Sequence, residues 1–179
     1  YTVYNTLSLH DALPISGIVA ALVLADRAGL FGTRPVGDIT KYGGRTFRVV
    51  KVVDGDTLDV DCPDGPREHT RVRLWGVDTP ETVKPDTPPQ HFGAGAARFA
   101  IDAAGGKDVT LELETRDTRD KYGRLLAYVV LPDGRMLNRL LIEEGYGYAD
   151  PRFDHRHAAE FRRLQDAARQ ARRGLWKDA

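Results

Sequence analysis

Five charged residues stand at the edges of apolar segments with the alternating pattern of β-strands. They are the carboxylates Asp56, Asp78 and Glu81 and the arginines Arg73 and Arg124. Carboxylate oxygens are the ligands that Ca²⁺ and Mg²⁺ take in proteins. Arginine binds phosphate through forked, charge-assisted hydrogen bonds. A chain that carries both kinds of group is therefore expected to act on phosphodiesters.

The pattern from residue 45 onward predicts short strands and a few helices. The strand patterns cover residues 46–53, 58–60, 69–77, 109–113 and 125–131. The helical patterns run over residues 94–104, from Met136 to Gly145 and from Phe161 to Gly174. Five strands with about three helices predict an α+β, mainly β fold, a five-stranded barrel of the OB type. By pattern alone, other α+β arrangements stay open.

Composition sets limits on partners and on metal chemistry. The chain has 179 residues, with 26 basic and 26 acidic side chains, so a nucleic-acid partner would need a local basic surface. Cys62 is the only cysteine, which excludes an intrachain disulfide and a thiolate zinc cluster. The size favours one globular domain, and a monomer is expected.

The N-terminal region predicts three segments. Residues 6–15 read TLSLHDALPI, which resembles the translation of a sequencing-library adapter, so residues 1–15 are expected to be an artefact. An apolar run over residues 17–25 is shorter than the roughly 20 residues of a bilayer span, and it predicts a truncated signal or membrane anchor. Residues 16–44 are thus expected to be this segment and a linker, and residues 45–179 the folded domain. An extracytoplasmic protein, secreted or anchored, is expected; an intracellular one is the alternative.

Four motifs together resemble the staphylococcal nuclease-like (thermonuclease) family. They are VVDGDTLDV, RVRLWGVDTPET, RDKYGRLLAYV and RRGLW, in this order, and they extend from about residue 46 to residue 176. The resemblance implies an OB-fold barrel with three helices. It also implies a Ca²⁺-dependent endonuclease and exonuclease that hydrolyses DNA and RNA and leaves 3′-phosphates.

The resemblance implies a metal site. Asp56 and Asp78 match the carboxylate ligands, and Thr79 matches the residue that offers a backbone carbonyl. Asp54 matches a second acid near the ion that does not bind it directly. Mg²⁺ or Mn²⁺ would use the same ligand types as Ca²⁺.

The resemblance also implies the catalytic and substrate-binding residues. Glu81 matches the general base or water-positioning residue, and Arg73 and Arg124 match the arginines that bind the phosphate. The positions that match substrate contacts are Lys121, Tyr122 and Tyr148. The chain departs from the family at Asp150, where a second aromatic residue is expected after Tyr148.

Less specific interpretations remain open for single residues and for the whole domain. Arg73 is also compatible with a solvated strand position or a buried ion pair, Arg124 with closing its own turn, and Asp54 with shaping a turn. His155 and His157 are expected at a solvated helix start. The alternative function is a catalytically silent OB-fold module that binds nucleic acid or protein.

Overall fold

The computed structural model describes residues 35–80 and 92–177, which belong to one compact unit. The expected adapter segment, the expected signal or anchor up to residue 34, and Glu81 lie outside the described residues. In the described part of the chain, no helix combines the length and apolar character needed to cross a membrane.

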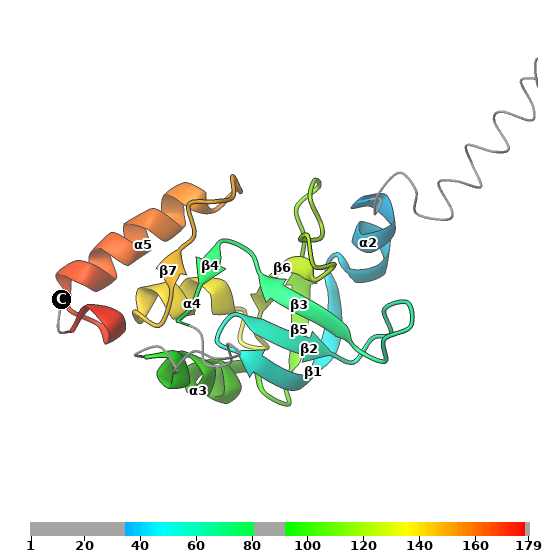
Figure 1. The fold of residues 1–179 in the computed structure, drawn as a ribbon, viewed down its shortest axis with the longest axis horizontal. Coiled ribbons are helices and arrows are strands. Elements are labelled where there is room, and N and C mark those ends of the chain that lie inside the picture. Colours follow the sequence, from blue (N-terminus) through cyan, green and yellow to red (C-terminus); the bar gives the residue numbers. More distant parts are fainter. Residues whose placement is uncertain (1–34, 81–91, 178–179) are drawn as a thin grey trace, which may run out of the picture. The chain divides into compact units, whose positions relative to one another are not determined.

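Five strands form a closed barrel in the order β1-β2-β3-β6-β5 (Figure 1). These are β1 (Arg45–Asp54), β2 (Thr57–Val60), β3 (Thr70–Leu74), β5 (Asp108–Glu112) and β6 (Leu125–Val130). All neighbouring pairs are antiparallel except β3 and β6, which run parallel. The barrel confirms the predicted α+β, OB-type fold.

The expected three helices cover part of the barrel, and a short two-stranded sheet joins them. The helices are α3 (Gly93–Ala104), α4 (Leu137–Glu143) and α5 (Ala158–Gln170), followed by the 3-10 turn η2 (Gly174–Trp176). Strands β4 (Val77–Asp78) and β7 (Tyr148–Ala149) pair outside the barrel. Helix α3 packs on β1, α4 on β6, and α5 on α4. Strand β4 thereby ties the end of β3 to the C-terminal region.

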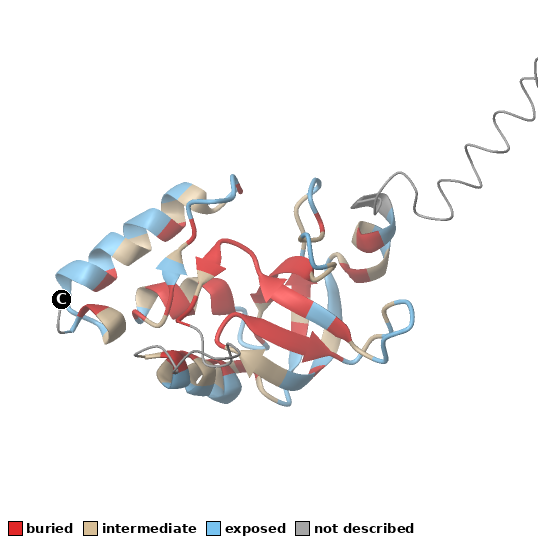
Figure 2. Cartoon of the chain, in the orientation of Figure 1, coloured by how far each residue is buried: buried red, intermediate tan, exposed pale blue. Residues whose placement is uncertain are grey.

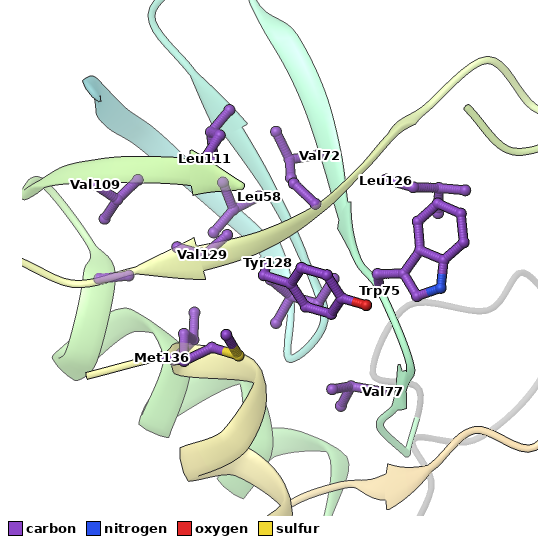
Figure 3. Close-up of a cluster of buried hydrophobic side chains, with 14 of the residues drawn as sticks. Leu58, Val72, Trp75, Val77, Val109, Leu111, Leu126, Tyr128, Val129 and Met136 are labelled. Carbon is purple, nitrogen blue, oxygen red and sulfur yellow. The ribbon is translucent and has the colours of Figure 1, made fainter. Parts of the chain in front are cut away.

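The core lies inside the barrel and beneath the helices, where Figure 2 shows the buried segments. Strand β5 alternates, with Val109 and Leu111 fully buried, as expected for a strand with one solvated face. Strand β6 is buried over Leu125–Val129, since one face points into the barrel and α4 covers part of the other. Figure 3 shows part of this cluster. Full burial of a Val or Leu side chain in this core stabilises the folded state by about 1.5–3 kcal/mol.

The strand expected over residues 69–77 is interrupted. Strand β3 ends at Leu74, Trp75 and Gly76 turn the chain, and β4 begins at Val77. Gly76 has φ +74°, and a Cβ there would lie 2.4 Å from Nε2 of His155. The left-handed backbone and the adjacent imidazole therefore demand glycine.

Part of the segment expected as a linker is helix α2 (Pro35–Tyr42), which packs on β1. Asp38 accepts hydrogen bonds from Nε and Nη2 of Arg119, both at 2.8 Å. Tyr42 is fully buried, and its hydroxyl is 3.0 Å from Oγ1 of Thr70. The expected boundary at residue 45 therefore falls inside the compact unit. Sequence reasoning missed this helix because glycines surround it and its anchoring partner lies some 80 residues away.

Candidate active site

A cleft of about 820 Å³ lies over β3 and β4, between residues 117–124 and residues 150–153. Figure 1 shows these two loops, yellow-green and orange, rising on the same side of β3. The cleft brings together seven of the sequence-predicted site residues: Asp54, Asp56, Arg73, Asp78, Lys121, Tyr122 and Arg124. They come from three separate motifs of the chain, so the fold assembles one polar site from dispersed segments.

Arg73 on β3 links the two carboxylates expected to bind metal. Its Nη1 lies 3.0 Å from Oδ2 of Asp56, and its Nη2 lies 2.9 Å from Oδ1 of Asp78. Nη1 also donates to the carbonyl of Val77 at 2.6 Å. Arg73 is buried, with only 9% of its surface exposed. It thus forms the buried ion pair that the sequence left open, while it also lines the cleft.

Asp56 is held in place by the turn between β1 and β2 and by the chain after β4. Thr57 Oγ1 donates to its Oδ1, and the backbone N–H of Thr79 donates to its Oδ2, both at 3.0 Å. A Cβ on Gly55 would lie 2.8 Å from Oγ1 of Thr79, so the close approach of these two turns requires glycine. Burial raises the pKa of Asp56 above 3.8, although Arg73 acts in the opposite direction.

One wall of the cleft presents Arg124 and Tyr122, which Asp120 positions. Oδ1 of Asp120 accepts the backbone N–H groups of Tyr122 and Arg124, both at 2.9 Å. Its Oδ2 accepts Nε of Arg124 at 2.6 Å, and the guanidinium lies 5.4 Å from the centre of the Tyr122 ring. Lys121 lies over the same ring at 5.0 Å. Arg124 thus closes its own turn and also lines the cleft.

The opposite wall presents Arg152, which sequence reasoning missed. Asp150 is buried and accepts Nη2 of Arg152 at 2.6 Å and Nε at 2.8 Å. Nη2 also lies 3.2 Å from Oδ1 of Asp78. Burial alone would raise the pKa of Asp150, but the hydrogen bonds from Arg152 outweigh it and the pKa lies below 3.8. The sequence signal was Asp-Pro-Arg, an acid two residues before an arginine.

Two of the predicted residues that the structure describes, Tyr148 and Thr79, are not among the residues that line the cleft. The ring of Tyr148 packs edge-on against Trp176, with ring centres 5.4 Å apart. Thr79 contacts Asp56, because its backbone N–H donates to Oδ2 of that carboxylate. Glu81 lies outside the described residues.

His155 is buried, which corrects the expectation of a solvated helix start. Its Nδ1 lies 3.1 Å from the hydroxyl of Tyr128, which donates to Oε1 of Glu114 at 2.7 Å. Because Tyr128 has one hydroxyl proton, Nδ1 of His155 carries the proton of the first bond. Burial and the nearby His157 lower the pKa of His155 below 6.5. The ring is buried because it packs against Gly76, in the turn after β3.

Comparison with known proteins assigns this chain to a family. The family described as staphylococcal nuclease homologue matches residues 71–178. A thermonuclease of Staphylococcus intermedius is 48% identical over 110 residues, which span 62% of each chain. A thermonuclease of Staphylococcus hyicus is 33% identical over 164 residues, 90% of this chain and 94% of the relative. An uncharacterized endonuclease of Escherichia coli O157:H7 is 35% identical over 132 residues, 74% of this chain and 77% of the relative. With this coverage, the chain belongs to the staphylococcal nuclease homologue family.

Proposed function

We propose that this nuclease hydrolyses the phosphodiester bonds of DNA and RNA in the cleft around Arg73. It requires a divalent cation, Ca²⁺ in the first instance, and leaves 3′-phosphates. The observation that supports this most is the single cleft in which Arg73 bridges Asp56 and Asp78 while Arg124 and Arg152 face it from two walls. Members of the family with the names thermonuclease and endonuclease support the activity.

The residues present fit a divalent cation. Asp56 is a buried carboxylate whose raised pKa reflects incomplete compensation of its charge. The buried Oγ1 of Thr79 has no hydrogen-bond partner among the described residues, so polar capacity is left beside Asp56. Asp56, Asp78 and the carbonyl of Thr79 would hold the ion, and oxygen donors of this kind suit Ca²⁺. No cluster of three or more His, Cys, Asp or Glu side chains that could hold a metal ion occurs within residues 35–80 and 92–177.

The cation and the charged residues would have separate roles in hydrolysis. When bound, the cation would neutralise a non-bridging phosphate oxygen and reduce the repulsion of the attacking water. Arg124 and Arg73 would donate to the phosphate oxygens as charge builds up at phosphorus. Nε of Arg73 has no hydrogen-bond partner in the described part of the chain, so it is available for this role. Glu81 would accept a proton from the attacking water as the water oxygen bonds to phosphorus, and the 5′ oxygen would leave and take a proton from solvent.

The test is cleavage by the full chain of plasmid DNA, single-stranded DNA and RNA, each with Ca²⁺ or with a chelator. Loss of all three substrates with Ca²⁺ alone, and products whose 3′ ends become extendable by a polymerase only after phosphatase treatment, would support the proposal. Arg135→Ala is a matched control for surface arginine loss, because Arg135 pairs with Asp133 in a turn away from the cleft. Binding without cleavage under every ion would instead indicate the silent OB-fold module.

A further inference from the structure

We propose that Arg152, Asp150 and Phe153 form a second nucleotide subsite, which binds a phosphate and a base of the strand beside the scissile bond. This inference rests on the proposed function, since its ligand is the single-stranded nucleic-acid backbone. It would make the cleft a site for an extended strand rather than for one phosphodiester.

The first step of the argument is the rigid placement of Arg152. The backbone N–H of Asp150 donates to the carbonyl of Gly76 at 3.0 Å, which fixes the chain just after β7 against the turn that follows β3. The Asp150 side chain is only 2% exposed and holds Arg152 by Nε and Nη2. A buried carboxylate that binds one side of a guanidinium fixes its orientation at little further entropy cost. Arg152 is thus positioned before any substrate arrives.

The second step is the binding capacity that Arg152 retains. Its side chain is 61% exposed and lines the cleft. Within the described residues, no hydrogen bond is made by Nη1. A guanidinium with one side held by a carboxylate and the other side in a polar cleft is suited to a phosphate oxygen.

The third step is the aromatic ring next to this arginine. Phe153 is 40% exposed, lines the cleft, and lies 6.0 Å from the Arg152 guanidinium. Its ring meets Trp75 edge-on at 6.1 Å, which braces it from behind. An exposed ring beside a phosphate-binding arginine is the arrangement on which a base of a single strand stacks. Phe153 would therefore supply an aromatic surface in a region where the chain has Asp150 at the position expected to be aromatic.

The opposite wall of the cleft contains the same three chemical groups. There Asp120 holds Arg124, and the guanidinium lies over the exposed ring of Tyr122. Two walls with an acid, an arginine and an aromatic ring flank Arg73 at the cleft floor. A strand that crosses Arg73 would meet one such set on each side, so contacts at both ends should strengthen with substrate length.

The experiment compares a thymidine octamer with thymidine 3′-(4-nitrophenyl) phosphate, which has one nucleoside and one phosphodiester. Arg152→Ala and Phe153→Ala are each expected to lower the ratio of kcat/KM on the octamer to kcat/KM on the small diester by about tenfold, the scale of one charge-assisted hydrogen bond or one stacked base. Arg152→Ala should also reduce the slope of log kcat/KM for the octamer against log salt by about 0.7, the value for one lost phosphate contact on a single strand.

The controls separate the subsite from folding and from the chemistry. Arg135 also pairs with an acid two residues earlier, and its side chain is similarly exposed. Arg135→Ala should therefore change neither the ratio nor the salt slope. The double variant Asp150→Asn, Arg152→Gln removes both charges together, so it tests the same ratio without a buried unpaired carboxylate. An unchanged ratio and salt slope in a folded Arg152 variant would overturn the subsite alone. A wild-type protein that cleaves neither substrate would overturn the proposed function instead.

Discussion

Nη1 of Arg73 lies 3.0 Å from the carboxylate of the buried Asp56, so the arginine proposed to bind phosphate and a carboxylate proposed to bind metal form an ion pair in the folded chain. Each side chain is about 10% exposed. Removing one member of such a buried pair leaves an uncompensated charge, which typically costs about 3–5 kcal/mol. The pair is therefore expected to contribute to the stability of the barrel.

The first prediction concerns this pair. Arg73→Ala should lower the free energy of unfolding by about 3–5 kcal/mol, and Arg73→Ala with Asp56→Ala should lower it less than the sum of the two single changes. Urea unfolding followed by circular dichroism measures both. Strict additivity in the double variant would show that the two charges do not interact.

The second prediction concerns Glu81. Glu81→Gln should slow turnover by about 10²–10⁴-fold, the usual contribution of a general base, while Ca²⁺ affinity changes little. Calorimetric titration with Ca²⁺ and single-turnover cleavage would be measured on the same preparation. If Ca²⁺ binding collapses in this variant, Glu81 is a metal ligand and its assignment as a base is wrong.

The third prediction concerns the contact between two turns at Gly55. In Gly55→Ala, the new methyl group would meet Oγ1 of Thr79 at 2.8 Å and Cβ of Ala96 at 2.9 Å. Overpacking of this kind costs about 1–3 kcal/mol, and it should displace Thr79 from Asp56 and reduce cleavage. Gly37→Ala is the control, because nothing lies within 4 Å of its added Cβ on α2. Equal thermal stability and activity in the two variants would contradict the account.

The fourth prediction concerns pH and His155. Its pKa is lower in the folded chain than the ordinary 6.5, so the unfolded chain binds its proton more readily. The resulting stability is fully present above pH 6.5 and is lost as the pH falls through the lower, folded pKa. Glu114 and Glu160 titrate below 4.5 and so contribute at more acidic pH. Thermal unfolding from pH 8 to pH 5 should show a smaller pH dependence in His155→Gln than in His69→Gln, and equal dependence would reject this role.

The fifth prediction concerns the start of the domain. A protein that begins at Arg45 lacks α2, so it leaves Arg119 without Asp38 and removes the buried Tyr42. It should melt at a lower temperature than the protein that begins at Pro35. Asp38→Asn in the longer protein should reproduce part of the loss, since it weakens the Arg119 pair. Equal melting temperatures would place the domain start at residue 45, as the sequence alone suggested.

The barrel was predictable because its strands carry local signals. Buried Val109 and Leu111 alternate with more polar residues, which indicates a strand from a few residues of sequence alone. Asp54-Gly55 indicates a turn in the same way. The family motifs singled out Asp56, Arg73 and Asp78, and the structure places them in one cleft. Localisation and the segments before residue 35 stay predictions.

What the sequence did not predict depends on contacts between distant segments. Helix α2 is fixed by an ion pair from Asp38 to Arg119, and no local pattern marks that pairing. His155 has polar neighbours in sequence, yet it is buried beside Gly76 and Tyr128. Arg152 lines the cleft because the chain after β7 is held against the turn that follows β3. Its position therefore depends on how β4 and β7, each two residues long, pair with one another.

The most direct test of the central claim is single-turnover cleavage of a 5′-labelled oligonucleotide by the wild type, Arg73→Lys and Arg135→Lys at saturating Ca²⁺. Lysine keeps the charge but loses the forked geometry. The account predicts that Arg73→Lys cleaves about 10²–10³-fold more slowly while it remains folded, and that Arg135→Lys matches the wild type. Wild-type rates in a folded Arg73→Lys protein would contradict the account, because they would place the chemistry outside this cleft.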